Sequence, residues 1–82
     1  MDKNTIIEKI GKKIAEDILN EPERNIGKEE ALISSGLIDS FSLVDLALVV
    51  EDLFGVQIDD AELSADTFDT LDQLADLVLQ RL

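Results

Sequence analysis

Apolar residues recur at helical spacing in three stretches of the chain. Residues 5–19 and 70–82 each carry one apolar stripe separated by polar positions, whereas residues 40–54 are apolar on nearly every side. Spacings of three and four residues place such positions on one face of an α-helix. The pattern therefore predicts three longer helices and almost no strand. The two stripes contain Ile6, Ile7, Ile10, Ile14, Ile18 and Leu19, and Leu71, Leu74, Leu77, Val78 and Leu82.

Capping residues predict where the first and last helices begin. Thr5 with Glu8, three residues later, fits a capping box, although Asn4 could also cap the first helix. Thr70 has Gln73 in the same relation and is expected to start the last helix. Proline disfavours helical backbone in the residue before it, so the first helix is expected to end before Pro22.

The segments between these helices complete the predicted architecture. Asp59 could cap a short helix over residues 60–64, and residues 22–38 form a long connection with recurring apolar residues. We therefore expect residues 1–82 to form a single all-α domain. Its predicted fold is a small four-helix bundle, with three longer helices, a short third one and a long loop between the first and second.

The middle helix holds the candidate chemistry at its start. Asp39 is a favoured N-cap residue, and Gly55 is a typical residue just past a helix end. Ser40 would lie exposed in the first turn, where the positive end of the helix dipole accommodates a phosphate. So small a domain cannot cover this apolar helix on every side. Its Ser40 end is expected to expose apolar residues surrounded by acids.

Composition limits the possible functions. The chain has neither cysteine nor histidine, so it lacks the commonest nucleophile, general base and soft metal ligands, and we expect neither an enzyme nor a metal site. Nineteen acids against seven bases give a net charge of −12, and only one base lies in residues 31–82. This charge repels nucleic acid and anionic membranes and would attract basic partners. The sequence shows no pattern of a signal peptide and no apolar run long enough to span a membrane, so we expect a cytoplasmic monomer.

Three segments together resemble the acyl carrier protein superfamily. Gly36-Leu37-Ile38-Asp39-Ser40-Phe41 is similar to its Gly-x-x-Asp-Ser-Leu/Met motif. Residues 51–58 look like its second signature, and Thr67-Phe68-Asp69-Thr70 has the matching spacing. The resemblance covers nearly all of residues 5–82. It includes carriers of fatty-acid and polyketide pathways as well as peptidyl and D-alanyl carriers.

The resemblance implies a function for Ser40. A separate phosphopantetheinyl transferase would attach 4′-phosphopantetheine from coenzyme A to this serine, and the arm would carry acyl groups as thioesters. Acyl-loading and acyl-transfer enzymes would bring basic patches to the middle helix. The positions that match partner contacts of the family are Asp39, Phe41, Val44, Asp45, Leu48, Glu51, Asp52 and, more weakly, Glu62.

Other functions remain open from the sequence. The carrier could serve a fatty-acid, polyketide or other specialised pathway, or it could be a D-alanyl or peptidyl carrier. An unmodified acidic helical adaptor would bind a basic partner without any role for Ser40. An acidic decoy for a nucleic-acid-binding protein is disfavoured by the apolar surface expected on the middle helix.

Overall fold

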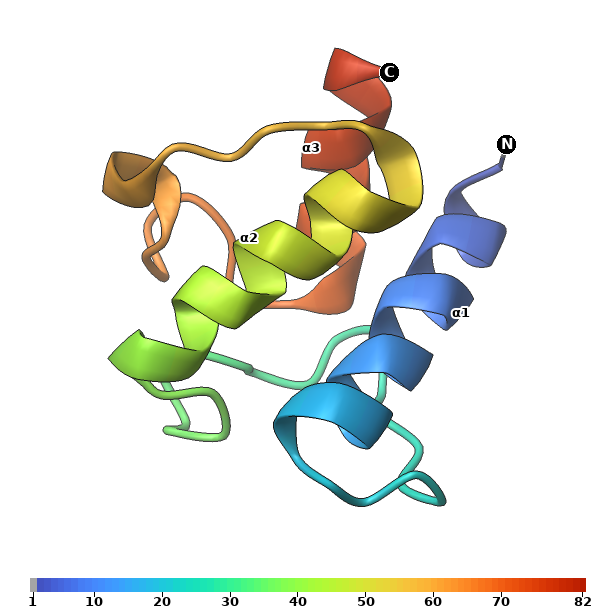
Figure 1. Cartoon of the computed structure of the whole chain (residues 1–82), viewed down its shortest axis with the longest axis vertical. Coiled ribbons are helices and arrows are strands. Elements are labelled where there is room, and N and C mark those ends of the chain that lie inside the picture. Colours follow the sequence, from blue (N-terminus) through green and yellow to red (C-terminus); the bar gives the residue numbers. More distant parts are fainter. Residues whose placement is uncertain (1) are drawn as a thin grey trace.

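The computed structural model describes residues 2–82, and in this part of the chain all regular structure is helical. In Figure 1 the long loop between the first two α-helices runs below the helices. No helix in residues 2–82 is long and apolar enough to cross a membrane. In chain order the elements are α1 (Lys3–Lys13), the π-helical turn η1 (Ile14–Ile18), α2 (Ser40–Phe54), the 3₁₀ turn η2 (Asp60–Glu62) and α3 (Leu71–Arg81).

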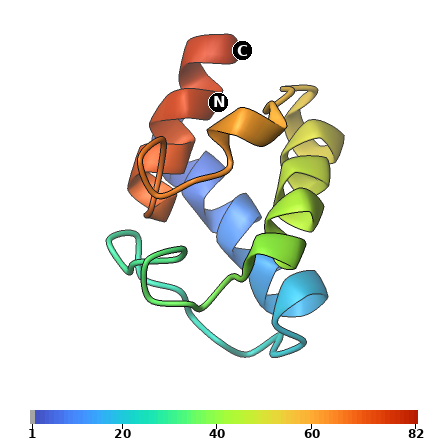
Figure 2. The same cartoon turned by 90° about the vertical axis from the view of Figure 1, so that its left-hand side faces the viewer.

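The α1 helix packs against both other helices. In Figure 2, α2 and α3 lie on opposite sides and α1 crosses between them. The contact between α1 and α3 is close at Gly11, where an added Cβ would lie 3.2 Å from Cδ1 of the buried Leu71. The absence of a side chain at Gly11 therefore allows a close packing contact between the two helices. With a larger residue at that position, either the Leu71 side chain or one of the two helices would have to shift.

Buried side chains from every part of the chain meet in one core. The loops supply Leu32, Ile38, Val56, Ile58 and Phe68 to it, and Phe68 is completely buried. The long connection is therefore held to the domain by its own apolar residues, as the sequence predicted. The helices contribute Ile6, Ile10 and Ile14, Leu43, Leu46 and Val50, and Leu71, Leu74, Ala75 and Val78.

The first helix begins earlier and ends differently than expected. Asp2, rather than Thr5 or Asn4, is the N-cap, and its carboxylate accepts a hydrogen bond from the Thr5 N–H at 2.8 Å. The helix then widens into η1, where the Leu19 N–H donates to the Ile14 carbonyl at 2.9 Å. Asn20 has a positive φ of 55°, so the helical segment ends before Pro22, as predicted.

The expected four-helix count is not confirmed. Residues 60–64 do not form a short α-helix. Only the single 3₁₀ turn of η2 is present there. Val56 and Ile58 are buried two positions apart, which is the spacing of extended chain and not of a helix. Asp60 and Ala61 are exposed, so a longer helix here would have little apolar face to bury.

The bounds predicted for the middle helix are confirmed. It runs from Ser40 to Phe54, with Asp39 as N-cap and Gly55 in the left-handed conformation at φ 70°. Thr70 likewise caps α3, accepting from the Gln73 N–H at 3.1 Å. In a capping box the Gln73 side chain would accept from the Thr70 N–H. Here it accepts instead from the Asp69 N–H at 2.7 Å.

Candidate functional site

The candidate site begins at Ser40, the first residue of α2, and Ser40 is exposed as the sequence predicted. The preceding residue, Asp39, accepts a hydrogen bond from the Ser42 N–H at 2.8 Å. This bond lowers the pKa of Asp39, because it stabilises the charged carboxylate. The serine hydroxyl therefore lies in an ordered first turn that another protein can reach.

An apolar strip continues from Ser40 along the outer side of α2. Phe41, Val44 and Leu48 are 86%, 49% and 58% exposed, although they belong to the most apolar helix of the chain. Residues three and four apart share one face of a helix, so these side chains form a continuous surface. Isolated apolar residues are common on protein surfaces, but a contiguous strip indicates contact with a partner.

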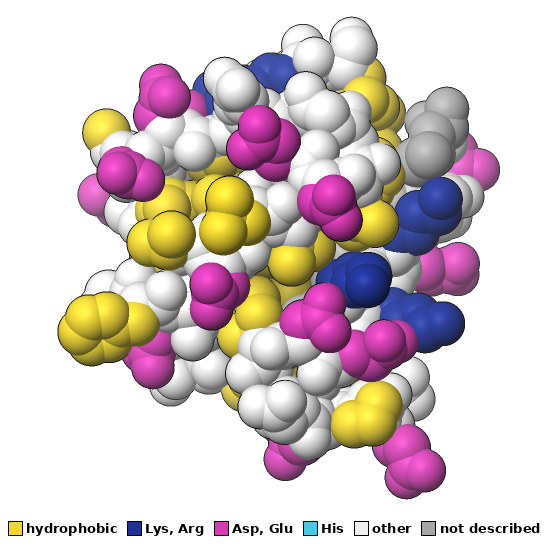
Figure 3. Space-filling model, in the orientation of Figure 1, with side chains coloured by type: hydrophobic (Ala, Val, Ile, Leu, Met, Phe, Trp, Pro, Cys, Tyr) yellow, Lys and Arg dark blue, Asp and Glu magenta, His cyan; other side chains and the backbone are white. Residues whose placement is uncertain are grey.

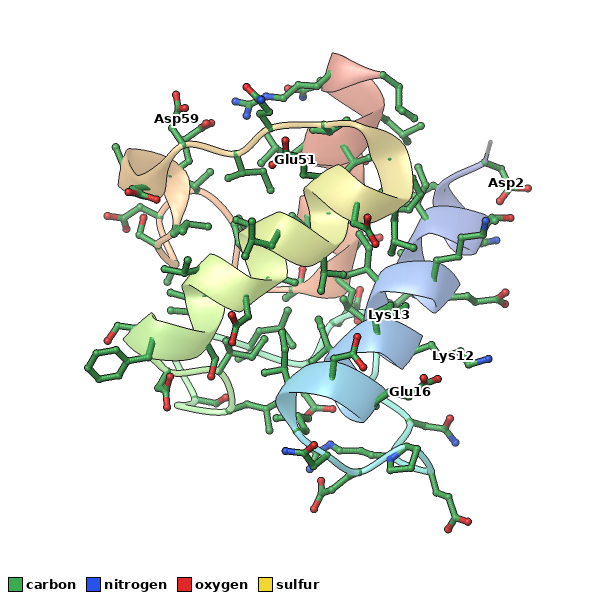
Figure 4. All side chains as sticks on the ribbon, in the orientation of Figure 1. Asp2, Lys12, Lys13, Glu16, Glu51 and Asp59 are labelled. Atoms are coloured by element: carbon green, nitrogen blue, oxygen red, sulfur yellow. The ribbon has the colours of Figure 1, made fainter. Side chains whose placement is uncertain are left out.

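Acidic side chains flank this strip, as the sequence predicted. Asp45, Glu51 and Asp52 are exposed on α2, and a shallow depression of about 550 Å³ lies beside Leu48, Glu51 and Asp52. Figure 3 shows hydrophobic side chains with acidic ones around them on this side of the molecule. Figure 4 places Glu51 near the end of α2, where its carboxylate is 3.5 Å from the Gln57 side-chain amide.

The structure separates Glu62 from this group. Both oxygens of its carboxylate bind the Arg81 guanidinium, with Oε1 2.9 Å from Nη1. Arg81 also donates to the Gln57 carbonyl at 3.0 Å, and Glu62 accepts from the Asp59 N–H at 3.1 Å. The Arg81 side chain is the largest influence that lowers the pKa of Glu62. The Glu62 carboxylate thus links η2 to the end of α3, whereas the carboxylates of α2 are exposed.

The first-turn position suits a phosphodiester. An exposed hydroxyl is available for attachment, and the helix dipole favours negative charge at this end. The Asp39 carboxylate opposes part of this effect, because a phosphate on Ser40 would place a second anion beside it. In residues 2–82 the structure contains no group of three or more acidic, histidine or cysteine side chains that could hold a metal ion.

A family model described as "Phosphopantetheine attachment site" matches residues 12–78, which include Ser40, the apolar strip, all of α2 and most of α3. The chain belongs to this phosphopantetheine-binding family. Its cofactor is accordingly covalently attached 4′-phosphopantetheine, and domains of this family are typically carriers without catalysis of their own. None of the curated proteins compared with the chain matches it.

Sequence reasoning missed the part that Asp69 plays beside the candidate site. Its carboxylate binds the loop that leads to Ser40, through hydrogen bonds to residues 33 and 34. The sequence offers only a weak signal for this contact, since an Asp before a capping Thr looks like part of a helix start. The bonding partners lie about 35 residues earlier, and only the folded chain brings them together.

Proposed function

We propose that Ser40 carries the 4′-phosphopantetheine arm and that the protein holds acyl groups as thioesters and presents them to partner enzymes. The observation that carries this proposal is the exposed Ser40 hydroxyl at the start of α2, within the matched region. The arm supplies a terminal thiol, the group that this chain lacks because it contains no cysteine. The protein's own contribution is to display the arm and to select partners.

Attachment requires a separate transferase. In this step the Ser40 Oγ attacks the phosphorus of coenzyme A that is bonded to pantetheine. The bond from that phosphorus to the second phosphate breaks, and adenosine 3′,5′-diphosphate leaves. The hydroxyl proton passes to a base of the transferase. Histidine is absent from this chain, which is consistent with a base that comes from the partner.

The side chains exposed on α2 indicate what kind of partner surface could bind there. Phe41, Val44 and Leu48 would enter an apolar recess, while Asp45 and Asp52 would face lysines and arginines around it. We propose that the transferase and the acyl-loading and acyl-transfer enzymes share this face, each through a basic patch. Charge attraction speeds such encounters and makes them sensitive to salt. The net charge of −12 also disfavours self-association, which supports a monomer.

Intact-mass measurement tests the attachment directly. Incubation with coenzyme A and a promiscuous phosphopantetheinyl transferase is expected to add the mass of one arm to the wild type. Ser40→Ala is expected to add nothing, yet to unfold at nearly the wild-type temperature, because Ser40 is exposed. Ser42→Ala, which changes a half-buried serine two positions later, is the matched control and should still accept the arm.

The same measurements distinguish the alternatives. A wild type that gains no mass, or a Ser40→Ala protein that does, would contradict the proposal. An unmodified adaptor would instead bind its partner fully without any arm. The mass of cargo on protein purified from its own host would tell a fatty-acid or polyketide carrier from a D-alanyl or peptidyl carrier.

A further inference from the structure

The Asp69 side chain ties the start of α3 to the long loop. Its Oδ1 accepts hydrogen bonds from the Ile33 N–H at 2.8 Å and the Ser34 N–H at 2.9 Å. Its Oδ2 accepts from the Ser34 hydroxyl at 2.5 Å, and its backbone carbonyl accepts from the Leu32 N–H at 2.6 Å. One acidic residue thus holds three consecutive loop residues.

Two of these three residues, Leu32 and Ile33, form the base of the turn that enters α2. The Ile38 N–H donates to the Leu32 carbonyl at 2.9 Å, and the Gly36 N–H donates to the Ile33 carbonyl at 3.0 Å. Leu32 and Ile38 are also fully buried. Ser40 follows Ile38 by only two residues. Asp69 is therefore linked to the turn before Ser40 by a series of hydrogen bonds and by buried side chains.

The bonding state of Asp69 suits this role. Hydrogen bonds from Ser34, first from its hydroxyl and then from its N–H, lower the pKa of Asp69. An ionised carboxylate acts only as an acceptor, and here it meets three donors. An Asn at this position would keep one oxygen for the two N–H groups, and its NH₂ group would donate to the Ser34 hydroxyl, which also accepts. An alanine, by contrast, would remove all three side-chain hydrogen bonds.

We propose that Asp69 is a positioning residue for the modification of Ser40, because it fixes the turn that delivers the serine hydroxyl to the transferase. This inference rests on the proposed function. The transferase would dock on α2 residues such as Phe41 and Val44. The hydrogen bonds of Asp69 described above do not involve these residues. Reaction rates fall steeply when reacting atoms are displaced, by about 100-fold for 1 Å. Loss of Asp69 should therefore lower kcat and leave KM nearly unchanged.

The test compares three variants in steady-state kinetics with coenzyme A and a promiscuous phosphopantetheinyl transferase. Asp69→Ala is expected to lower kcat by about tenfold, with KM for the carrier within about twofold of wild type. Ser34→Ala removes only the hydroxyl bond and should give a smaller loss of the same kind. Asp76→Ala is the matched control. It changes the net charge equally and removes a carboxylate of α3 that binds the Lys3 ammonium at 2.9 Å, so both constants should stay at wild-type values.

Amide hydrogen exchange supplies a readout that separates positioning from a general loss of stability. In Asp69→Ala, the amides of Ile33, Ser34 and Ile38 should exchange faster, while that of Val50 in the middle of α2 should not change. A wild-type kcat in Asp69→Ala, an equal loss in Asp76→Ala, or a uniform rise in exchange would overturn the inference. If Asp69→Ala fails to fold, a wild-type kcat in Ser34→Ala would overturn it. A wild type that is not modified at all would refute the proposed function, and this inference with it.

Discussion

Gly11 lies where α1 and α3 approach each other, and its substitution tests whether that spacing is fixed. A Cβ at this position would be 3.2 Å from Cδ1 of Leu71, whereas carbon atoms in optimal contact are about 3.5–4.0 Å apart. Leu71 is 1% exposed and has little room to move. One side chain or one helix must therefore shift by several tenths of an ångström in Gly11→Ala.

Two opposing effects set the expected magnitude. Alanine in place of glycine inside a helix contributes about 1 kcal/mol of stability through helix propensity. Overpacking of a filled core typically costs about 1–3 kcal/mol. Taking about 2 kcal/mol for the second effect, we expect Gly11→Ala to destabilise the protein by about 1 kcal/mol, or to lower Tm by about 4–8 °C in a domain of this size.

Urea unfolding of a double-mutant cycle provides the measurement. Leu71→Val removes the two δ carbons, so Gly11→Ala in that background should lose its clash and become stabilising by about 1 kcal/mol. The coupling between the two sites would then be about 2 kcal/mol, within the range seen for residues in contact. Gly27→Ala is the control, because its Cβ would meet Glu30 at an ordinary 3.8 Å, and it should be neutral or stabilising.

The outcome that refutes the reasoning is equally definite. If Gly11→Ala stabilises the wild type by the full propensity effect and shows no coupling to Leu71, the spacing between α1 and α3 adapts freely. Gly11 would then not be required for the packing of the two helices.

Two further predictions concern charge. Arg81 lowers the pKa of Glu62, so the stability from this pair should be fully present above the unfolded pKa of Glu, about 4.3, and should disappear as the pH falls through the lower folded value. The difference in unfolding free energy between wild type and Glu62→Gln should therefore shrink from pH 7 to pH 3, and a difference that stays constant in urea titrations would contradict this sign. Added salt should raise Tm, because it screens repulsion among the eleven acids of residues 31–82, and a Tm that fell with salt would remove this account of the acidic half.

The sequence by itself determined the features whose causes lie within a few residues. The bounds of α2 follow from Asp39 as N-cap and Gly55 as its left-handed end, and both are local backbone effects. The exposure of Ser40 and Phe41 was also predictable, since a helix apolar on nearly every side cannot be covered in 82 residues. The motif around Ser40 then indicated the family.

Only the tertiary structure showed which polar groups bind distant parts of the chain. Glu62 matches a partner contact in sequence, and the fold also pairs it with Arg81, nineteen residues away. A short helix was expected over residues 60–64, yet Asp60 and Ala61 are exposed and only one 3₁₀ turn forms there. In the sequence, Asp69 looked like part of the start of a helix. In the structure its carboxylate binds residues 33 and 34 of the loop before Ser40. Hydrogen bonds and ion pairs between residues far apart in the chain leave no periodic pattern in the sequence, because their partners become neighbours only when the core forms.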